Sequence, residues 1–241
     1  MLPEGARVAL SPTFDDARPS QLEVALPLLD GHGIRASFYV LPGAVARRRR
    51  EWEAVVAAGH EIGNHTVTHP CSANFAFSRA NALEDYTLEG IEDEIDRASG
   101  LVEELLGRRP RTLAYPCGQS FVGRGAERAS YVPVVARRFL AGRGCGSETP
   151  NDPRRCDLAH VDAYAVDGLD GNHLVGLVED EGAEGRWVVM VGHDVGDGGE
   201  QTVLAGALEA LCHRARTGDV WVAPVAEVAG WLRGQDRAKA P

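Results

Sequence analysis

The stretch Gly63-Asn64-His65-Thr66-Val67-Thr68-His69-Pro70 carries two histidines four residues apart. On a helical turn, residues at this spacing share one face, so both imidazoles could bind one divalent metal ion. The three β-branched residues between them disfavour a regular helix, and no Glu follows the first histidine as in the helical zinc-protease pattern. We therefore predict a turn at a strand end. The alternative is a polar loop in which two histidines share this spacing by chance.

A third metal ligand is expected from the run Thr13-Phe14-Asp15-Asp16, which ends an apolar segment and so marks the tip of a strand. Two histidines and one carboxylate leave a coordination position open for water, as in catalytic zinc sites. Adjacent residues of a strand point to opposite sides, so both carboxylates can face one site only if the backbone bends after Phe14. This combination makes hydrolysis the leading hypothesis.

Predicted strands and helices alternate along the whole chain, about seven of each. This alternation, at 241 residues, predicts one α/β domain with a parallel sheet in a closed or nearly closed β/α barrel. An open doubly wound sheet is the alternative. The glycine-rich run 141–146 is expected to be a loop. The expected strands are 7–14, 34–41, 60–64, 111–115, 158–166, 187–191 and 220–223, and the expected helices are 20–30, 44–58, 82–106, 131–140, 174–181, 201–216 and 225–233.

Several polar residues directly follow the predicted strands. They are Asp15, Asp16, His65, the pair Pro116-Cys117 and the pair His193-Asp194. In β/α barrels the carboxyl ends of the strands form the rim where active sites are assembled. We therefore expect these residues to gather on one side of the barrel.

Composition excludes several classes of function. The formal net charge of −10 presents no basic surface to a nucleic acid. No apolar run reaches the roughly 18 residues that span a bilayer, and residues 1–6 do not resemble a signal peptide. We expect a cytoplasmic protein, or a secreted one if the chain is a processed form. The five scattered cysteines suggest neither a disulfide framework nor a cysteine zinc site, so free thiols in a reducing compartment are expected.

Four motifs, in this order, resemble those of the polysaccharide deacetylase family, the NodB-like carbohydrate esterases of family 4. They are Thr13-Phe14-Asp15-Asp16, His65-Thr66-Val67-Thr68-His69-Pro70, Ala114-Tyr115-Pro116-Cys117-Gly118 and Val189-Met190-Val191-Gly192-His193-Asp194. The resemblance spans residues 7 to about 223. It implies a distorted (β/α)7-type barrel, a NodB homology domain over residues 1–234, followed by a frayed tail at 235–241.

The resemblance also implies roles for individual residues. Asp16, His65 and His69 would hold one divalent metal, with Zn²⁺ expected and Fe²⁺, Co²⁺, Ni²⁺ or Mn²⁺ as alternatives. Asp15 would be the general base and His193 the general acid. The main-chain N–H of Cys117 would stand in the oxyanion hole.

The sequence departs from the family pattern at three motifs. Ala17 follows the acidic pair where the family has Gly, and Ala114 replaces the Arg that orients the catalytic base. Arg143 could reach in from a neighbouring loop instead, or be an ordinary surface arginine. The family's Asp-x-x-Asp-Trp motif is represented by 167–171, with Asp170 as a supporting candidate and no Trp.

The leading hypothesis is a metal-dependent hydrolase that removes acetyl groups from an N-acetylated sugar or glycan. One alternative keeps the scaffold and the metal but takes a small-molecule amide or ester. Another is a non-catalytic carbohydrate-binding barrel. Neither a nucleic acid nor a membrane is expected as a partner, and nothing in the sequence indicates an oligomeric state.

Overall fold

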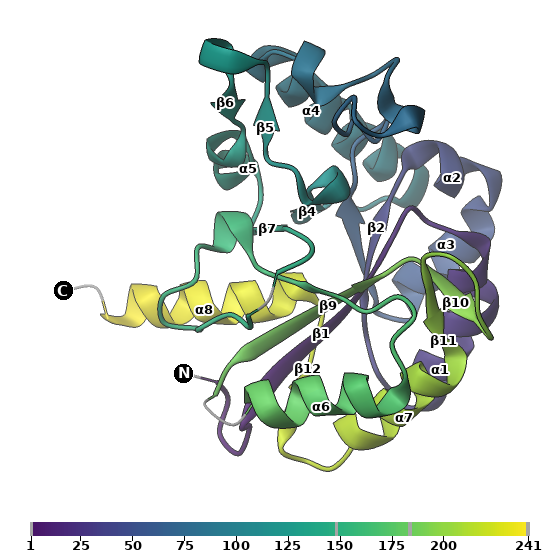
Figure 1. Ribbon diagram of the computed structural model, residues 1–241. Helices are drawn as coiled ribbons and strands as arrows, with labels where there is room; N and C mark the ends of the chain where they lie inside the picture. The colour runs from purple at the N-terminus through teal and green to yellow at the C-terminus, as the bar shows by residue number, and fades with distance from the viewer. Residues whose placement is uncertain (1, 148, 183–184, 240–241) are drawn as a thin grey trace.

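Strand β1 (Val8–Asp15) lies at the centre of the sheet, and all of its residues are buried. A strand that is buried along its whole length suits a parallel sheet that is covered on both faces. Its first half pairs with β12 (Val220–Val222) and its second half with β2 (Ser37–Val40), so these two strands share one edge of β1. The other edge pairs with β9 (Trp187–Gly192). The computed structural model describes residues 2–147, 149–182 and 185–239 (Figure 1).

The main sheet is parallel throughout, in the order β7-β4-β3-β2-β1-β9-β8, with β12 added beside β1. Val161, just before β8, exchanges main-chain hydrogen bonds of 2.7 and 2.8 Å with Gly142 and Gly144 at β7. The strands therefore form a curled half-barrel in a single domain, which confirms the predicted fold class. The remaining strands of this sheet are β3 (Glu61–Asn64), β4 (Thr112–Ala114), β7 (Ala141–Arg143) and β8 (Tyr164–Ala165).

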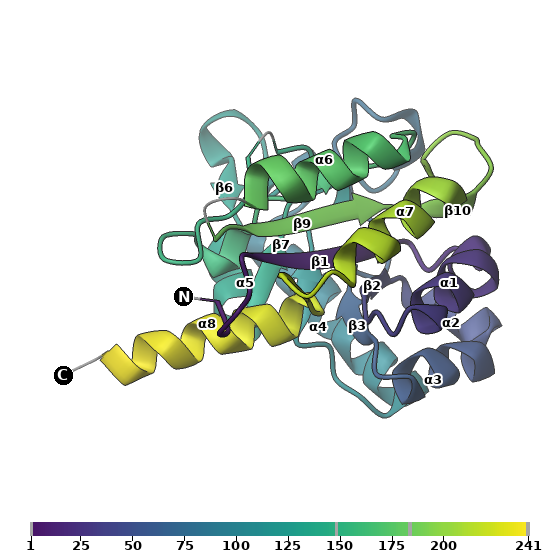
Figure 2. The same ribbon diagram turned by 90° about the horizontal axis from the view of Figure 1, so that it is seen from below.

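Helices surround the curled sheet (Figures 1 and 2). In both views α6 and α7 lie side by side on one side of β1 and β9, while α8 lies near the N-terminal end of β1. A short π-helical turn at Gln21–Ala25 leads into α1. The helices are α1 (Leu26–Gly31), α2 (Pro42–Arg47), α3 (Arg49–Ala57), α4 (Leu88–Leu106), α5 (Val132–Arg138), α6 (Gly171–Gly182), α7 (Ala205–Ala215) and α8 (Val225–Lys239).

Helix α4 shows how local sequence sets an element that supports the site. Thr87 caps its first turn by accepting a hydrogen bond from the Gly90 N–H, and Gly107 ends it in the left-handed conformation. Its buried residues include Ile91 and Ile95, which recur at helical spacing. Residues 82–87, expected to belong to this helix, contain instead a separate 3₁₀ turn at Leu83–Asp85.

The prediction of a loop at 141–146 is wrong for the first half of this range, because residues 141–143 form strand β7. The range resembles a loop in the sequence because it is rich in glycine. Gly142 is needed there since a Cβ would lie 2.5 Å from the Ala159 carbonyl oxygen and 2.8 Å from the Tyr115 ring. A glycine in a strand interior often marks such a close approach.

Helix α8 extends through residues 235–239, which were expected as a frayed tail, and residues 240–241 lie outside the described part.

The expected strand at 158–166 is shorter than predicted. Its first residues form a 3₁₀ turn, Leu158–His160, and only β8 is a strand. None of the helices in the described ranges has the length and apolar content needed to cross a lipid bilayer.

Candidate active site

The candidate residues lie at the carboxyl ends of neighbouring parallel strands. Asp15 is the last residue of β1, and His65 directly follows β3. Arg143 is the last residue of β7, and His193 directly follows β9. Because the carboxyl ends of parallel strands share one edge, the fold brings these distant segments together.

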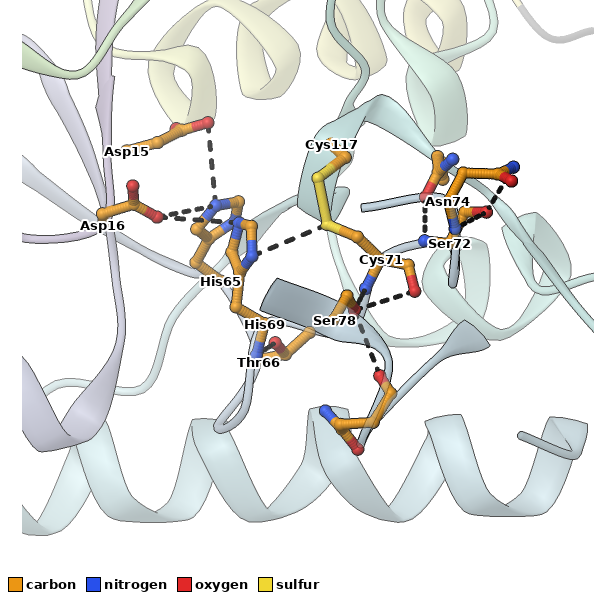
Figure 3. The surroundings of a disulfide bond; sticks show 12 residues. Asp15, Asp16, His65, Thr66, His69, Cys71, Ser72, Asn74, Ser78 and Cys117 are labelled. Atoms are coloured by element: carbon orange, nitrogen blue, oxygen red, sulfur yellow. Dashed lines mark hydrogen bonds and ion pairs between the residues drawn. A yellow bond between two sulfur atoms is a disulfide. The ribbon is translucent and has the colours of Figure 1, made fainter. Parts of the chain in front are cut away.

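The backbone turns sharply after β1. Asp16 and Ala17 have φ angles of 74° and 56°, both in the left-handed region. Non-glycine residues adopt this region at a cost of about 1–2 kcal/mol each. This turn is the bend that the sequence required, and it lets the Asp15 and Asp16 carboxylates both face the histidines (Figure 3).

The two histidines are joined by a turn rather than a helix, as predicted. The Asn64 side-chain oxygen accepts a hydrogen bond of 2.8 Å from the Thr66 N–H. The Thr66 hydroxyl accepts one of 3.0 Å from the His69 N–H. Thr66 and His69 both have positive φ, so the backbone reverses between the imidazoles.

Helix α4 anchors this turn. The Glu94 carboxylate accepts hydrogen bonds from the Val67 and Thr68 N–H groups, at 3.1 and 2.6 Å. The Asn64 side-chain NH₂ donates to the Ile95 carbonyl oxygen at 2.9 Å. The position of both histidines is therefore fixed by helix α4 and not only by the turn itself.

Asp16, His65 and His69 present three donor atoms that all lie within 4.8 Å of one another. Asp16 Oδ1 is 3.6 Å from Nε2 of each histidine. The other oxygen, Oδ2, accepts a hydrogen bond of 2.9 Å from Arg18. His65 Nδ1 lies 2.9 Å from the Ala114 carbonyl oxygen, which can only accept, so Nδ1 donates to it and Nε2 is the nitrogen that faces Asp16.

This donor set fits a divalent cation. Ligands at zinc-bond length in a tetrahedral site lie roughly 3.3 Å apart, close to the 3.6 Å observed here. Burial and the neighbouring charge of His65 lower the pKa of His69, which favours the neutral form that binds metals.

A second group with metal-binding geometry, His32, Glu209 and His213, lies apart from this site on α7 and the end of α1.

Asp15 is paired with Arg143, and both side chains are buried. The Arg143 Nη2 donates to both carboxylate oxygens, at 2.5 Å for Oδ2. Burial alone would raise the pKa of Asp15, but the charge of Arg143, with those of His65 and His193, keeps it below the ordinary value. Arg143 is the residue of β7 that pairs with Ala114 of β4, so it reaches Asp15 from the adjacent strand.

His193 is oriented by a carboxylate that the sequence analysis did not select. Its Nδ1 lies 2.6 Å from Asp167 Oδ2, and its main-chain N–H donates to Asp167 Oδ1 at 3.1 Å. The side chain of Asp170, the expected candidate, is 58% exposed and binds His173 at the start of α6. Asp167 could have been chosen, because it directly follows the predicted strand 158–166.

Gln21 is a further residue that the sequence analysis missed. Its side-chain NH₂ donates to the main-chain carbonyl oxygens of Asp15 and His193, at 2.5 and 2.9 Å. This buried amide therefore ties the ends of β1 and β9 together. No motif marks it in the sequence.

A disulfide joins Cys71 and Cys117 beside His65 and His69, with 6.0 Å between the Cα atoms (Figure 3). The expectation that all five cysteines are free thiols is therefore wrong. The two cysteines are 46 positions apart in the sequence, and only the fold brings them within bonding distance. Cys71 Sγ lies 3.6 Å from His69 Nδ1, so the bond links the histidine turn to the turn that carries the Cys117 amide.

Comparison with known proteins identifies the family. The sequence model described as "Polysaccharide deacetylase" matches residues 4–127, slightly more than half of the 241 residues. The chain belongs to the polysaccharide deacetylase family. The resemblance seen in the motifs is thereby confirmed.

Among curated relatives of this family member, a chitooligosaccharide deacetylase of Bradyrhizobium sp. is 32% identical over 108 residues, 44% of each chain. The chain spans less than half the length of the first curated relatives it matches. Among solved structures, the peptidoglycan deacetylase PdaC from Bacillus subtilis is 18% identical, with a TM-score of 0.59 over 96% of this chain and 94% of that one. A family 4 acetyl xylan esterase from Clostridium thermocellum, in complex with a cobalt ion, is 17% identical, with a TM-score of 0.61 over 92% and 91%. At these identities the two structures show a shared fold.

The disulfide gives a prediction about stability. Replacing Cys71 and Cys117 together by Ser should lower the free energy of unfolding of this deacetylase-family protein by about 2–4 kcal/mol, because the cross-link closes a long loop of the unfolded chain. Urea unfolding with and without a dithiol reductant measures this. The wild-type protein should lose stability on reduction and the double variant should not. Equal stability of the reduced and oxidised wild type would contradict the prediction.

Proposed function

We propose that this protein is a metal-dependent deacetylase that hydrolyses the acetamide of an N-acetylated carbohydrate, with water as the nucleophile. The observation that carries the proposal is the convergence of Asp16, His65 and His69 next to the buried Asp15. Family membership supports the same reaction class.

Asp16, His65 and His69 would hold the ion. Zinc suits two imidazoles and one carboxylate with an open position, and Fe²⁺, Co²⁺, Ni²⁺ or Mn²⁺ could take the same set. The chemistry that the ion supplies when bound is to lower the pKa of water and to polarise a carbonyl oxygen. Arg18 holds the outer oxygen of Asp16, which leaves the inner oxygen directed toward the histidines.

Asp15 would be the general base. Its pairing with Arg143 keeps it ionised, so that it can accept a proton from the attacking water. The guanidinium also fixes the orientation of the carboxylate, because Arg143 is itself held by a hydrogen bond of 2.8 Å to the Gly144 carbonyl oxygen. Asp15 Oδ2 lies 3.7 Å from His65 Nε2, which brings the base beside the metal ligands.

His193 would be the general acid that protonates the departing amine. Asp167 binds Nδ1, so Nε2 is the nitrogen that can donate to the leaving group. The Cys117 main-chain N–H would stabilise the developing oxyanion. Cys117 has a φ of 53° after Pro116, and the disulfide restrains this turn.

The pair of His193 and Asp167 predicts a pH dependence. Burial by itself lowers the pKa of His193, but the hydrogen bond to Asp167 and the charge of Asp15 outweigh it and raise the pKa above 6.5. A raised pKa keeps the imidazole protonated to higher pH, so activity should fall only above that pKa. Asp167→Asn removes the negative charge and should move the alkaline limb of the kcat/KM profile to lower pH. An unchanged alkaline limb would contradict the assignment of His193 as the acid.

Acetate release from soluble N-acetylated chito-oligosaccharides, compared with small acetamides, tests the proposed function. We expect release from the oligosaccharides. Release only from small acetamides or esters would favour the small-molecule alternative. Metal binding without release from any substrate would favour a non-catalytic barrel.

A further inference from the structure

Two phenylalanine rings lie on the surface beside the candidate active site. Phe75 and Phe77 are 43% and 69% exposed, although both are large apolar side chains. Their rings stack with centroids 5.4 Å apart and an interplanar angle of 29°. The Phe77 ring centroid is 6.4 Å from that of His69. Exposed aromatic surface next to a site is typical of a binding surface rather than of packing.

The segment that carries these rings is held in place. The Ser78 hydroxyl accepts a hydrogen bond of 2.8 Å from the Cys71 N–H and donates one of 2.9 Å to the Cys71 carbonyl oxygen. The Phe75 N–H donates to the Ser72 carbonyl oxygen at 3.0 Å. Cys71 is also fixed by the disulfide (Figure 3), so the turn that carries the two rings is restrained.

A cavity of about 670 Å³ begins at this segment, where Ser72 and Asn74 line it. In Figure 3 these two residues lie across the disulfide from Asp16 and His65. A cavity of this size is in the range of small-molecule sites. Among the residues that line the cavity, the Arg128 guanidinium lies 4.2 Å from the centroid of the Phe121 ring. The cavity lining includes Ser72, Asn74, Glu84, Gln119, Phe121 and Arg128.

We propose that Phe75 and Phe77 form a stacking subsite for a sugar ring next to the one that carries the scissile acetamide, and that the sugar chain continues into this cavity. The substrate is then an N-acetylated oligosaccharide rather than a monosaccharide or a small amide. The C–H faces of a pyranose pack against aromatic rings, while its hydroxyl groups need polar partners. The two phenylalanines supply the aromatic surface, and the cavity supplies the polar partners. The pair provides aromatic surface from a different loop where the Trp of the 167–171 motif is missing. This inference rests on the proposed function.

The test compares a long substrate with one that is too small to reach the rings. In the zinc-loaded enzyme, the Phe75→Ala/Phe77→Ala variant should lower kcat/KM for the N-acetylglucosamine tetramer by about 10–100-fold, mainly through KM. Its rate on methyl acetate should change less than threefold. Phe77→Trp should retain activity on the tetramer. Leu88→Ala, which removes another exposed apolar side chain, from the start of α4, should change neither rate.

Calorimetric binding of the tetramer, measured in an Asp15→Asn background, separates this inference from the proposed function. Loss of tetramer binding in the double Phe variant supports the subsite, whatever the activity of the wild type. If the wild type releases no acetate from any substrate, only the proposed function is overturned. Unchanged tetramer binding, or an equal loss of rate on methyl acetate and the tetramer, would overturn the subsite.

Discussion

Asp15→Asn is expected to lower kcat by about 10²–10⁴-fold while the protein retains its metal ion. The amide cannot accept a proton from water, but the three metal ligands are untouched. The substitution also leaves the buried Arg143 without its counter-charge. Removing one partner of a buried ion pair costs about 3–5 kcal/mol of stability, so unfolding must be measured alongside activity.

Asp93→Asn is the matched control for this experiment. Asp93 lies exposed on α4, and the same substitution there should leave kcat, metal content and stability unchanged. If folded, metal-loaded Asp15→Asn protein turned over within threefold of the wild type, Asp15 would not be the base.

His65→Ala is expected to abolish both metal retention and turnover. It removes one of the three proposed metal ligands, and loss of only an outer partner of a metal ligand already costs about 10–100-fold in affinity. Metal content after dialysis, measured by elemental analysis, should fall from one ion per chain to a residual level. Because His32, Glu209 and His213 could bind an additional ion, both proteins should carry His213→Ala.

The exposed His173 provides the control, and His173→Ala should retain the ion and the activity. Full metal content in folded His65→Ala protein would show that the ion is bound elsewhere. The proposed site would then be wrong, whatever the activity.

The ends of strands are the part of the site that the sequence could predict. Asp15 ends one predicted strand and His65 follows another, so parallel strands alone place them on one rim. The need for a backbone bend after Phe14 was also visible, since adjacent strand residues cannot otherwise face the same side. The left-handed conformations of Asp16 and Ala17 meet that need.

Contacts between segments far apart in the sequence could not be predicted in the same way. Arg143 looked like a loop residue because glycines flank it, yet Gly142 is there to permit close packing within a strand. The pairing of Ala114 with Arg143 depends on strand register, which local sequence does not specify. The Cys71–Cys117 bond likewise depends on two loops meeting at the rim.

The choice between Asp167 and Asp170 shows a different limit. Both occur in the run 167–171, and a motif alone gives no reason to prefer one. Position relative to the strand decides, because Asp167 leaves β8 at the rim whereas Asp170 starts α6 and binds His173. The predicted strand 158–166 already placed Asp167 at the rim, so position could have decided the choice, whereas the hydrogen bond to His193 required the structure.

Acetate release from an N-acetylated oligosaccharide by metal-stripped protein, before and after addition of one equivalent of Zn²⁺, tests most directly whether Asp16, His65 and His69 hold a catalytic ion. We expect that the stripped protein releases no acetate and that addition of the ion restores release. The His65→Ala variant should release no acetate before or after addition. If the stripped wild-type protein released acetate at the same rate before and after addition of Zn²⁺, this account would be contradicted.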